Sequence, residues 1–384
     1  MTTQILNEEE RMLQSLVRDF ADRELAPRAQ EVDEKEEFSW ENWDGLGKLG
    51  LTGIGIDSKY GGSGGGYRQA VIAASETARG DVSASTTLIA HLSLGTSTIY
   101  RFGNEEQKLR LVPPLASGKG VAAWALTEPD GGSDAAALQT TATEKDGTYF
   151  LNGSKVFITN AEVAESIVVF ATVDRSKGHK GISAFVVPKE SPGLQINPQK
   201  GKMGIRGSGT NEVVFQNTPV PAHNLLGEEG EGFKYAMDIL DTSRIVVAAQ
   251  CVGIGQAALE HAVRYAQQRE TFGKPIANHQ AIQFMIADMA TQVHASRSIT
   301  MEAATLKDEN MPFHTEASMA KLLASEMCVN VSSQALQVHG GYGYFKDAPV
   351  ERLFRDARVT TIYEGTSEVQ RLVIARHVLN QYSN

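Results

Sequence analysis

The chain has 384 residues, of which 41% are hydrophobic and 21% are charged, and its formal net charge is −10. This length and apolar content predict two or three folded domains with substantial cores. The acidic balance excludes a broad polyanion-binding surface, so nucleic acid is not an expected partner.

The N-terminal residues show neither the basic and apolar segments of a secretory signal nor the Arg-rich, acid-poor composition of a transit peptide. No window approaches the roughly 18 uninterrupted apolar residues of a membrane span. The two cysteines, Cys251 and Cys328, each lie in a helical pattern, so we expect them to fill the core without a disulfide or a metal site. These features predict a cytoplasmic protein that does not span a membrane.

Helical periodicity dominates residues 1–118, which we expect to form an N-terminal all-α domain. Apolar residues recur at helical spacing from Asn7, a predicted N-cap, to about Val32, and similar patterns follow. Two glycine-rich stretches in this domain imitate nucleotide-binding loops. Residues 45–50 fit the dinucleotide fingerprint formally, but a polar and aromatic segment precedes them instead of a buried strand. Residues 61–66 lack the Gly-Lys-Ser/Thr ending of a phosphate loop, so we expect a flexible surface loop there.

Short β-branched and aromatic runs replace the helical pattern in the middle of the chain. They predict strands at 149–151, 156–159, 166–173, 182–187 and 212–215. Asp146-Gly147 and Asn152-Gly153 are typical of tight turns between such strands. Residues 119–228 are therefore predicted to form an antiparallel β domain.

The helical period returns at about residue 229. Phe233, Met237, Leu240, Val247 and Cys251 stripe one long helix, and further helices are expected at 278–307, 314–338 and 367–380. Residues 229–384 are therefore predicted to form a C-terminal helical bundle. An α, β, α order without alternating strands and helices argues against a doubly wound parallel sheet.

A candidate general base lies near the C-terminus, where Glu364 precedes Gly365. Glycine lets the backbone approach a ligand closely, and a glutamate in a dry pocket has a raised pKa that suits removal of a weakly acidic C–H proton. Taken alone, a Glu-Gly pair is more often an ordinary surface turn between helices. The pair indicates catalysis only together with the rest of the chain.

Six motifs occur together and in a fixed order, at 124–134, 153–160, 202–207, 269–274, 337–343 and 363–366. Their combination resembles the acyl-CoA dehydrogenase family over essentially the whole chain. The resemblance implies a helical domain, a β-barrel domain and a C-terminal four-helix bundle, in agreement with the patterns above. The segments 355–358 and 363–375 are most similar to those of short-chain, butyryl-type members.

The resemblance also implies FAD as cofactor, bound in two parts. Residues expected to lie at the flavin are Trp124, Leu126, Thr127, Gly132, Ser133, Phe157, Ile158, Thr159, Thr366, Ser367 and Glu368. A second set is expected to contact the FAD of a neighbouring subunit, namely Arg269, Phe272, Gln280, Gln337, Val338, His339, Gly340 and Gly341. A guanidinium and exposed backbone N–H groups suit a pyrophosphate. A shared site of this kind implies a homotetramer arranged as a dimer of dimers, and no metal is expected.

The family resemblance assigns the base to Glu364. A minority of the family carries its base on the long C-terminal helix, but the matching residue here is Ser243, which cannot serve. Implied contacts to the acyl-CoA substrate are Ser133, Asp241, Thr242, Ser243, Arg244, Tyr363 and Gly365. The implied reaction is removal of the α-proton by Glu364 and hydride transfer from the β-carbon to flavin, which gives a trans-2-enoyl-CoA. Electron-transferring flavoprotein is the implied acceptor.

Three alternatives remain open from the sequence. The substrate can be a branched short-chain or a medium-chain acyl-CoA. An acyl-CoA oxidase shares the base and the flavin motifs but usually has a much longer chain. A non-enzymatic, DNA-associated flavin protein of the same family carries a basic C-terminal extension, which this acidic chain lacks.

Overall fold

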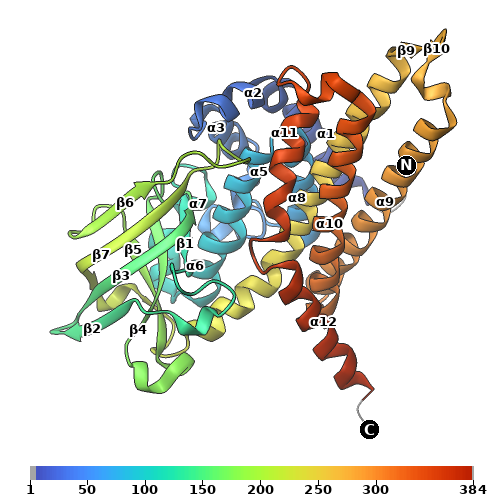
Figure 1. Ribbon diagram of the computed structural model, residues 1–384. Helices are drawn as coiled ribbons and strands as arrows, with labels where there is room; N and C mark the ends of the chain where they lie inside the picture. The colour runs from blue at the N-terminus through green and yellow to red at the C-terminus, as the bar shows by residue number, and fades with distance from the viewer. Residues whose placement is uncertain (1–5, 383–384) are drawn as a thin grey trace.

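The computed structural model describes residues 6–382. Figure 1 shows a β-sheet on one side of the molecule, a bundle of long C-terminal helices on the other, and the N-terminal helices between and behind them. The all-α, β and all-α order predicted from the sequence is therefore confirmed.

The N-terminal part consists of short helices wrapped around the start of the bundle. These are α1 (Glu8–Phe20), α2 (Ala26–Lys35), α3 (Trp40–Lys48), α4 (Tyr67–Gly80), α5 (Val82–Ile89), α6 (Ser97–Phe102) and α7 (Glu105–Ala116). The predicted N-cap is confirmed, because the Asn7 side chain accepts a hydrogen bond from the Glu10 N–H and the Glu10 carboxylate accepts one from the Asn7 N–H, each at 2.9 Å. One π-helical turn, Ala21–Leu25, joins α1 to α2, so the helical path is continuous to Lys35.

Neither glycine-rich stretch follows a strand in the part of the chain that the structure describes. Residues 45–50 belong to α3 and the turn after it, and the part of the chain described before them contains no strand. Residues 61–66 form a surface loop, as predicted. The Gly64 N–H donates to the Ile56 carbonyl at 2.9 Å and the Gly55 N–H donates to the Gly64 carbonyl at 2.8 Å, so backbone hydrogen bonds fix the loop.

The middle part is an eight-stranded sheet with the hydrogen-bonded order β6-β7-β3-β2-β4-β5-β8, and β1 pairs with β4. Its strands are β1 (Ala122–Ala125), β2 (Thr141–Lys145), β3 (Thr148–Thr159), β4 (Ser166–Thr172), β5 (Ile182–Pro188), β6 (Leu194–Pro198), β7 (Thr210–Pro221) and β8 (Leu225–Leu226). Most pairs are antiparallel, as predicted. The β1–β4 ladder and a single β2–β4 pair are parallel.

One of the two predicted turns is wrong. Asp146-Gly147, with φ of 51° and 76°, is the two-residue turn between β2 and β3. Asn152-Gly153 instead lies inside β3, at a register shift against β7, so the predicted strands 149–151 and 156–159 are one strand. A side chain at Gly153, where φ is 146°, would meet Thr140 on the neighbouring segment. Glycine is required here by a bulge and a close backbone approach, not by a chain reversal.

The two faces of the sheet bury different cores. On β4, Val168 and Phe170 pack with Ile99 and Leu115 of the N-terminal helices. The alternate residues, such as Val169, pack in a second cluster with residues of β1, β3, β5 and β7. The sheet therefore curves around the second core and is held against the helices by the first.

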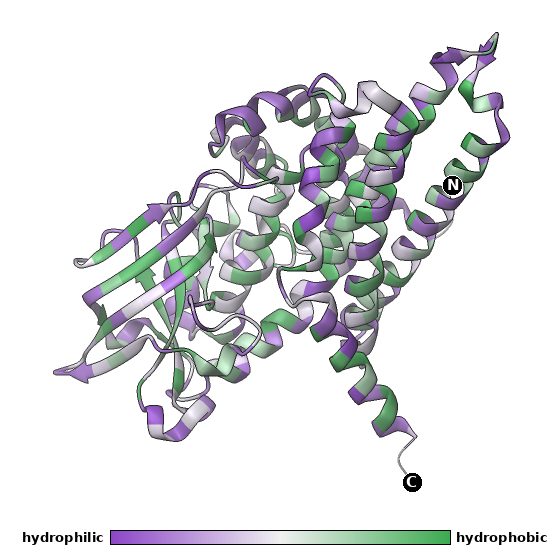
Figure 2. Ribbon diagram, viewed as in Figure 1, coloured by the Kyte–Doolittle hydropathy of each residue, from purple (hydrophilic) through white to green (hydrophobic). Residues whose placement is uncertain are grey.

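The C-terminal part contains α8 (Gly232–Gln268), α9 (Gln280–Asp308), α10 (His314–His339), α11 (Pro349–Ala357) and α12 (Ser367–Gln381). A small hairpin, β9 (Glu270–Thr271) and β10 (Lys274–Pro275), joins α8 to α9, and neither it nor α11 was predicted. In Figure 2 hydrophobic residues are concentrated where the helices face one another. Cys251 and Cys328 are buried free thiols in this core, as predicted.

Helix α8 is long and apolar enough to cross a membrane by length and composition, but 78% of its most apolar window is buried inside the protein. Its apolar residues are therefore accounted for by the bundle core, and the other described helices do not pass this test.

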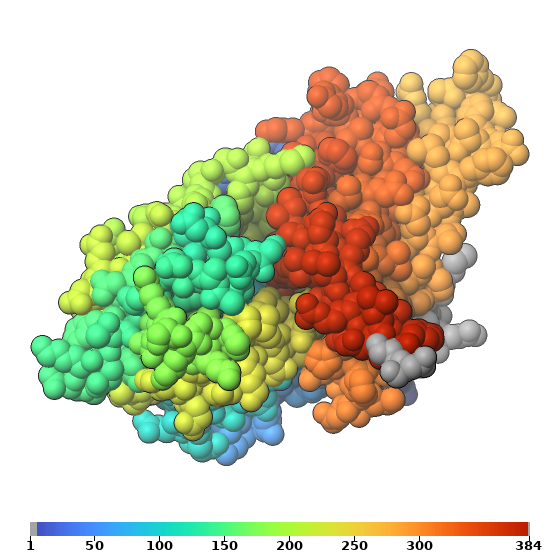
Figure 3. All heavy atoms as spheres, turned by 60° about the horizontal axis from the view of Figure 1, so that its bottom comes forward, coloured from blue at the N-terminus to red at the C-terminus, as the bar shows by residue number. Residues whose placement is uncertain are grey.

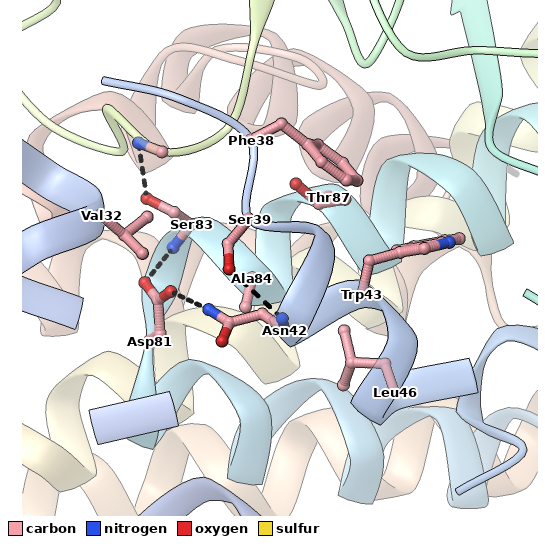
Figure 4. A pocket seen from close by; sticks show the side chains of 11 residues that line it. Val32, Phe38, Ser39, Asn42, Trp43, Leu46, Asp81, Ser83, Ala84 and Thr87 are labelled. Carbon is pink, nitrogen blue, oxygen red and sulfur yellow. Dashed lines mark hydrogen bonds between the residues drawn. The ribbon is translucent and has the colours of Figure 1, made fainter. Parts of the chain in front are cut away.

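Buried carboxyl groups lie where the three parts of the chain meet. Figure 4 shows a small pocket between α2, α3 and α5, in which Asp81 accepts hydrogen bonds from the Asn42 amide at 3.2 Å and the Ser83 N–H at 2.9 Å. Burial raises the pKa of Asp81 to about 6. Asp356 of α11 accepts a hydrogen bond from the Ile205 N–H at 2.5 Å, and burial raises the pKa of Asp356 to about 7. These groups join the parts of the chain structurally.

Asp356→Asn should flatten the dependence of stability on pH. Because the pKa of Asp356 is raised in the folded state, the unfolded chain loses this proton first, and stability falls as pH rises from about 4 to about 7. The asparagine stays neutral and its amide oxygen can still accept from the Ile205 N–H. We expect the free energy of unfolding of the variant at pH 8 to equal or exceed that of wild type, by up to a few kcal/mol. Urea midpoints at several pH values measure this.

The matched control is Asp44→Asn, which changes an exposed carboxylate and should leave the pH dependence unaltered. A variant at position 356 with the full wild-type slope between pH 4 and 7 would contradict the prediction.

Candidate active site

The segment around Glu364 is a turn held in an unusual backbone conformation. Glu364 has a φ of 49° and Gly365 a φ of 94°, both in the left-handed region. Thr366 then caps α12, and its hydroxyl accepts a hydrogen bond from the Val369 N–H at 3.3 Å. Helix α12 therefore begins only at Ser367, so Glu364 precedes it and does not share a helical face with Glu368, which is exposed.

The carboxylate of Glu364 is poorly solvated. Its side chain is half-buried, but its Oε2 is fully enclosed and has no hydrogen-bond partner among the described residues. Burial raises the pKa of Glu364 above its usual value, and Ser243, Lys321 and Arg244 oppose that rise, in this order of size. An enclosed carboxylate oxygen without a partner points to a ligand or a reacting group.

Helix α8 supplies the second wall of this site. Arg244 is buried, and its Nη1 donates to the Asp241 carboxylate at 2.6 Å. Ser243 and Thr242 are also buried, and their hydroxyls donate back to the carbonyls of Leu240 at 3.1 Å and Ile239 at 2.9 Å. The structure thus brings Ser243 and Arg244 to Glu364, as the predicted substrate set requires.

Tyr363 ties the turn to α8 and, through α8, to the N-terminal helices. Its hydroxyl donates to Gln250 Oε1 of α8 at 2.5 Å, and the amide nitrogen of Gln250 donates to the Thr86 hydroxyl of α5 at 2.6 Å. The position of the candidate base is therefore fixed by a hydrogen-bond relay between α8 and the N-terminal helices.

A second group of predicted residues lies at the ends of β1 and β3. The Val156 N–H donates to the Thr127 carbonyl at 2.9 Å, which places the loop after β1 beside β3. Gly132 and Ser133 of this loop are exposed, whereas Leu126 is buried. Figure 3 shows the C-terminal segment in red bordering this part of the middle domain in teal, with α8 in yellow below them.

Phe157 is the most unusual of these residues. It lies at a register shift in β3, has a φ of 61°, and is 67% exposed, while Ile158 beside it is buried and Thr159 is half-buried. The indole N–H of Trp124 on β1 is also enclosed and has no partner among the described residues. An exposed aromatic ring on strained backbone fits the planar ring system of FAD, because strain of this kind persists where function requires it.

Two residues of this group were missed from the sequence. Lys155 is buried, and its ammonium donates to the Glu128 carboxylate at 2.7 Å and to the Leu126 carbonyl at 3.1 Å. Glu128 also accepts from the Thr140 N–H at 2.9 Å. This buried ion pair fixes the loop after β1. The sequence did contain a signal for this pair, because Glu128 lies in the motif at 124–134 and Lys155 in the motif at 153–160.

The remaining predicted cofactor residues lie around a groove at the other end of the bundle. It has a volume of about 880 Å³ and is lined by Arg269, Val338, His339, Gly340 and Gly341, among others. Phe272 projects beside it from the β9–β10 hairpin and is 95% exposed. Gln280 and Gln337 are exposed and do not line the groove.

His339 has a structural role in this groove. Its Nδ1 lies 2.8 Å from the Ala335 carbonyl, its ring stacks on Tyr265 at 4.3 Å, and burial lowers its pKa. These neighbours pack the ring of His339 and give it a backbone contact.

The two groups of cofactor residues do not meet within one chain. Figure 1 places the β9–β10 hairpin at the far end of the bundle from the sheet and from the start of α12. A site that uses Arg269 and Phe157 on the same ligand therefore requires a second copy of the chain.

Comparison with known proteins gives matches along the whole chain. Models of the acyl-CoA dehydrogenase N-terminal, middle and C-terminal domains match residues 7–119, 123–218 and 230–379. The acryloyl-CoA reductase (NADH) of Anaerotignum propionicum is 48% identical, over 98% of this chain and 96% of its own length. The mitochondrial short-chain specific acyl-CoA dehydrogenase of Bos taurus is 46% identical, over 98% and 92%.

Two solved structures are similarly close. Butyryl-CoA dehydrogenase from Megasphaera elsdenii superposes with a TM-score of 0.95 at 45% identity, covering 97% of this chain and 99% of its own. The second is a chain from a structure described as the electron transferring flavoprotein of Acidaminococcus fermentans. It superposes with a TM-score of 0.96 at 45% identity, covering 97% of this chain and 98% of its own.

Proposed function

The chain belongs to the acyl-CoA dehydrogenase family, and we propose that it oxidises short-chain acyl-CoA thioesters to trans-2-enoyl-CoA with Glu364 as the base. The observation that carries this assignment is the enclosed, unpartnered Oε2 of Glu364, close to Ser243, Lys321 and Arg244. A carboxylate in these surroundings is poorly solvated, so it gains from taking up a proton.

The chemistry requires the chain to remove a proton that is far too weakly acidic for a carboxylate in water. An acyl chain that fills the space beside Glu364 excludes water and raises the pKa of the carboxylate further. The negative charge that develops on the thioester oxygen needs a donor, and the backbone N–H of Glu364 is the chain's own donor in this proposal. One such donor contributes about 3 kcal/mol to transition-state stabilisation.

The hydride acceptor is FAD, which takes the β-hydrogen when bound. Phe157 and Thr159 with the loop 126–133 would face its ring system, together with Thr366 and Ser367. Arg269 and the turn at 338–341 would hold the pyrophosphate of a neighbouring subunit's FAD. The separation of these groups within one chain supports a site shared between two copies, and we propose that the shared sites lie in a homotetramer.

The names of the relatives support a short acyl group. The bovine relative is named as short-chain specific and the Megasphaera elsdenii structure as a butyryl-CoA dehydrogenase. Similarity to a chain from the electron transferring flavoprotein structure supports such a flavoprotein as electron acceptor. We propose a cytoplasmic location, which the two buried free thiols, Cys251 and Cys328, fit.

One relative favours a second candidate function. The Anaerotignum propionicum protein is named as a reductase of acryloyl-CoA that uses NADH, which is the reverse direction on a short substrate. In that direction the protonated Glu364 would deliver a proton to the α-carbon. The same residues serve both directions, so the electron partner and the substrate supplied decide between them.

Anaerobic titration with acyl-CoA thioesters of four to twelve carbons tests the proposal. We expect the oxidised flavin band to bleach most deeply with butyryl-CoA, because a short substrate completes the dry pocket around Glu364. Deepest bleaching at eight or more carbons, or with branched thioesters only, would replace the short straight-chain assignment. Hydrogen peroxide formed in air would indicate an oxidase, and flavin that no thioester bleaches would overturn the enzymatic assignment.

A further inference from the structure

A lysine with no carboxylate partner is buried directly behind the candidate base. Lys321 lies in the middle of α10, is 0% exposed, and its Nζ donates to the Gly365 carbonyl at 2.7 Å. Among the described residues it forms no ion pair within 4.0 Å. Lys155, the other fully buried lysine, has the Glu128 carboxylate at 2.7 Å.

Burying an ammonium without an ion pair is costly unless another charge compensates it. The largest influence on the pKa of Lys321 is burial, which lowers it. Cys251 and Glu364 raise this pKa, Arg244 lowers it, and Cys328 raises it. Cys251 and Arg244 face it from α8 and Cys328 from α10, and Glu368 at the start of α12 also senses its charge. The thiols are neutral when protonated and Glu368 is exposed, so Glu364 is the buried carboxylate available as counter-ion.

We propose that Lys321 is a positioning residue for Glu364 that holds the Glu364-Gly365 turn through the Gly365 carbonyl and supplies the positive charge that keeps the base ionised. This inference rests on the proposed role of Glu364. The turn needs such support, because the left-handed backbone conformation of Glu364 is strained for a residue other than glycine. The ammonium also opposes the rise that burial causes in the pKa of Glu364.

The structure allows the two effects of Lys321 to be separated. The side-chain amide of Gln370, at the start of α12, donates to the same Gly365 carbonyl at 3.1 Å. One charged donor and one neutral donor therefore hold one acceptor. Lys321→Met removes a hydrogen bond and a charge, whereas Gln370→Leu removes a hydrogen bond alone.

The test is the pH dependence of flavin reduction by butyryl-CoA in the holoenzyme. The rate plotted against pH has a limb that reports ionisation of the base. In Lys321→Met this limb should move to higher pH by at least one unit, because the cation no longer favours the ionised carboxylate. At pH 7 the rate should fall at least tenfold and recover partly at high pH. Gln370→Leu should lower the rate without moving the limb, and Lys321→Arg should restore the wild-type limb.

A Lys321→Met profile with its limb at the wild-type pH, or an equal shift in Gln370→Leu, would overturn the inference. If Lys321→Met does not fold, Lys321→Gln is measured instead. A readout without turnover is the infrared carboxylate band of Glu364, identified by its loss in Glu364→Gln, which should titrate at higher pH in the lysine variants. If Glu364→Gln keeps its activity, Glu364 is not the base and the proposed function fails. An unshifted pH profile of Lys321→Met contradicts only the role proposed for Lys321.

Discussion

Glu364→Gln is expected to reduce the rate of flavin reduction by butyryl-CoA by about 10²- to 10⁴-fold, since a general base contributes a factor in this range. Glutamine has the same shape but cannot take up the α-proton. Ser243, which faces Glu364 from α8, is not basic enough to substitute. Stopped-flow measurement of the bleaching of the flavin band gives the rate.

The variant should bind FAD normally and be at least as stable as wild type at neutral pH. Because burial raises the pKa of Glu364 in the folded state, ionisation of this group lowers the free energy of unfolding as pH rises. The neutral amide of glutamine removes this loss of stability. Glu326→Gln is a suitable control, since it breaks only an ion pair with Arg371 on the surface, at 2.6 Å. An active Glu364→Gln enzyme would show that the base is another residue.

Elements with local signals were predictable from the sequence. The N-cap at Asn7, the long helix α8, and the turn at Asp146-Gly147 depend on residues close together in the chain, and all three are confirmed. Asn152-Gly153 carries the same turn signal but is a bulge, because the conformation of Gly153 is set by the approach of Thr140. Such a tertiary contact leaves no local trace.

The candidate site divides in the same way. Glu364 and Phe157 were identified because they belong to motifs that match a family, and not because the sequence reveals their backbone strain. Lys321 and Lys155 were missed because a lysine in a helix or strand normally reads as solvent-exposed. Only the folded chain shows that Lys321 faces the Gly365 carbonyl and Lys155 faces Glu128. The roles of buried charges therefore had to come from the structure.

Phe157→Gly should separate the stability of the protein from its affinity for FAD. The ring is 67% exposed, so its loss costs the apoprotein little apolar burial. Its φ of 61° is strained for phenylalanine and free for glycine, so relief of strain should offset the greater flexibility of the unfolded chain. We expect the urea midpoint of the apoprotein to stay unchanged or to rise.

Affinity for FAD should fall by tenfold or more in the same variant, because an aromatic contact to the flavin contributes about 1 kcal/mol beyond the area it buries. Phe157→Trp should retain the affinity, since it keeps a ring at the same position. Flavin fluorescence during titration of the apoprotein measures the dissociation constant. A Phe157→Gly protein with wild-type affinity would mean that the exposed ring serves another contact and that the strain in β3 is unrelated to the cofactor. Opposite changes in stability and affinity would instead indicate that the β3 bulge is maintained for the flavin, at the expense of the apoprotein.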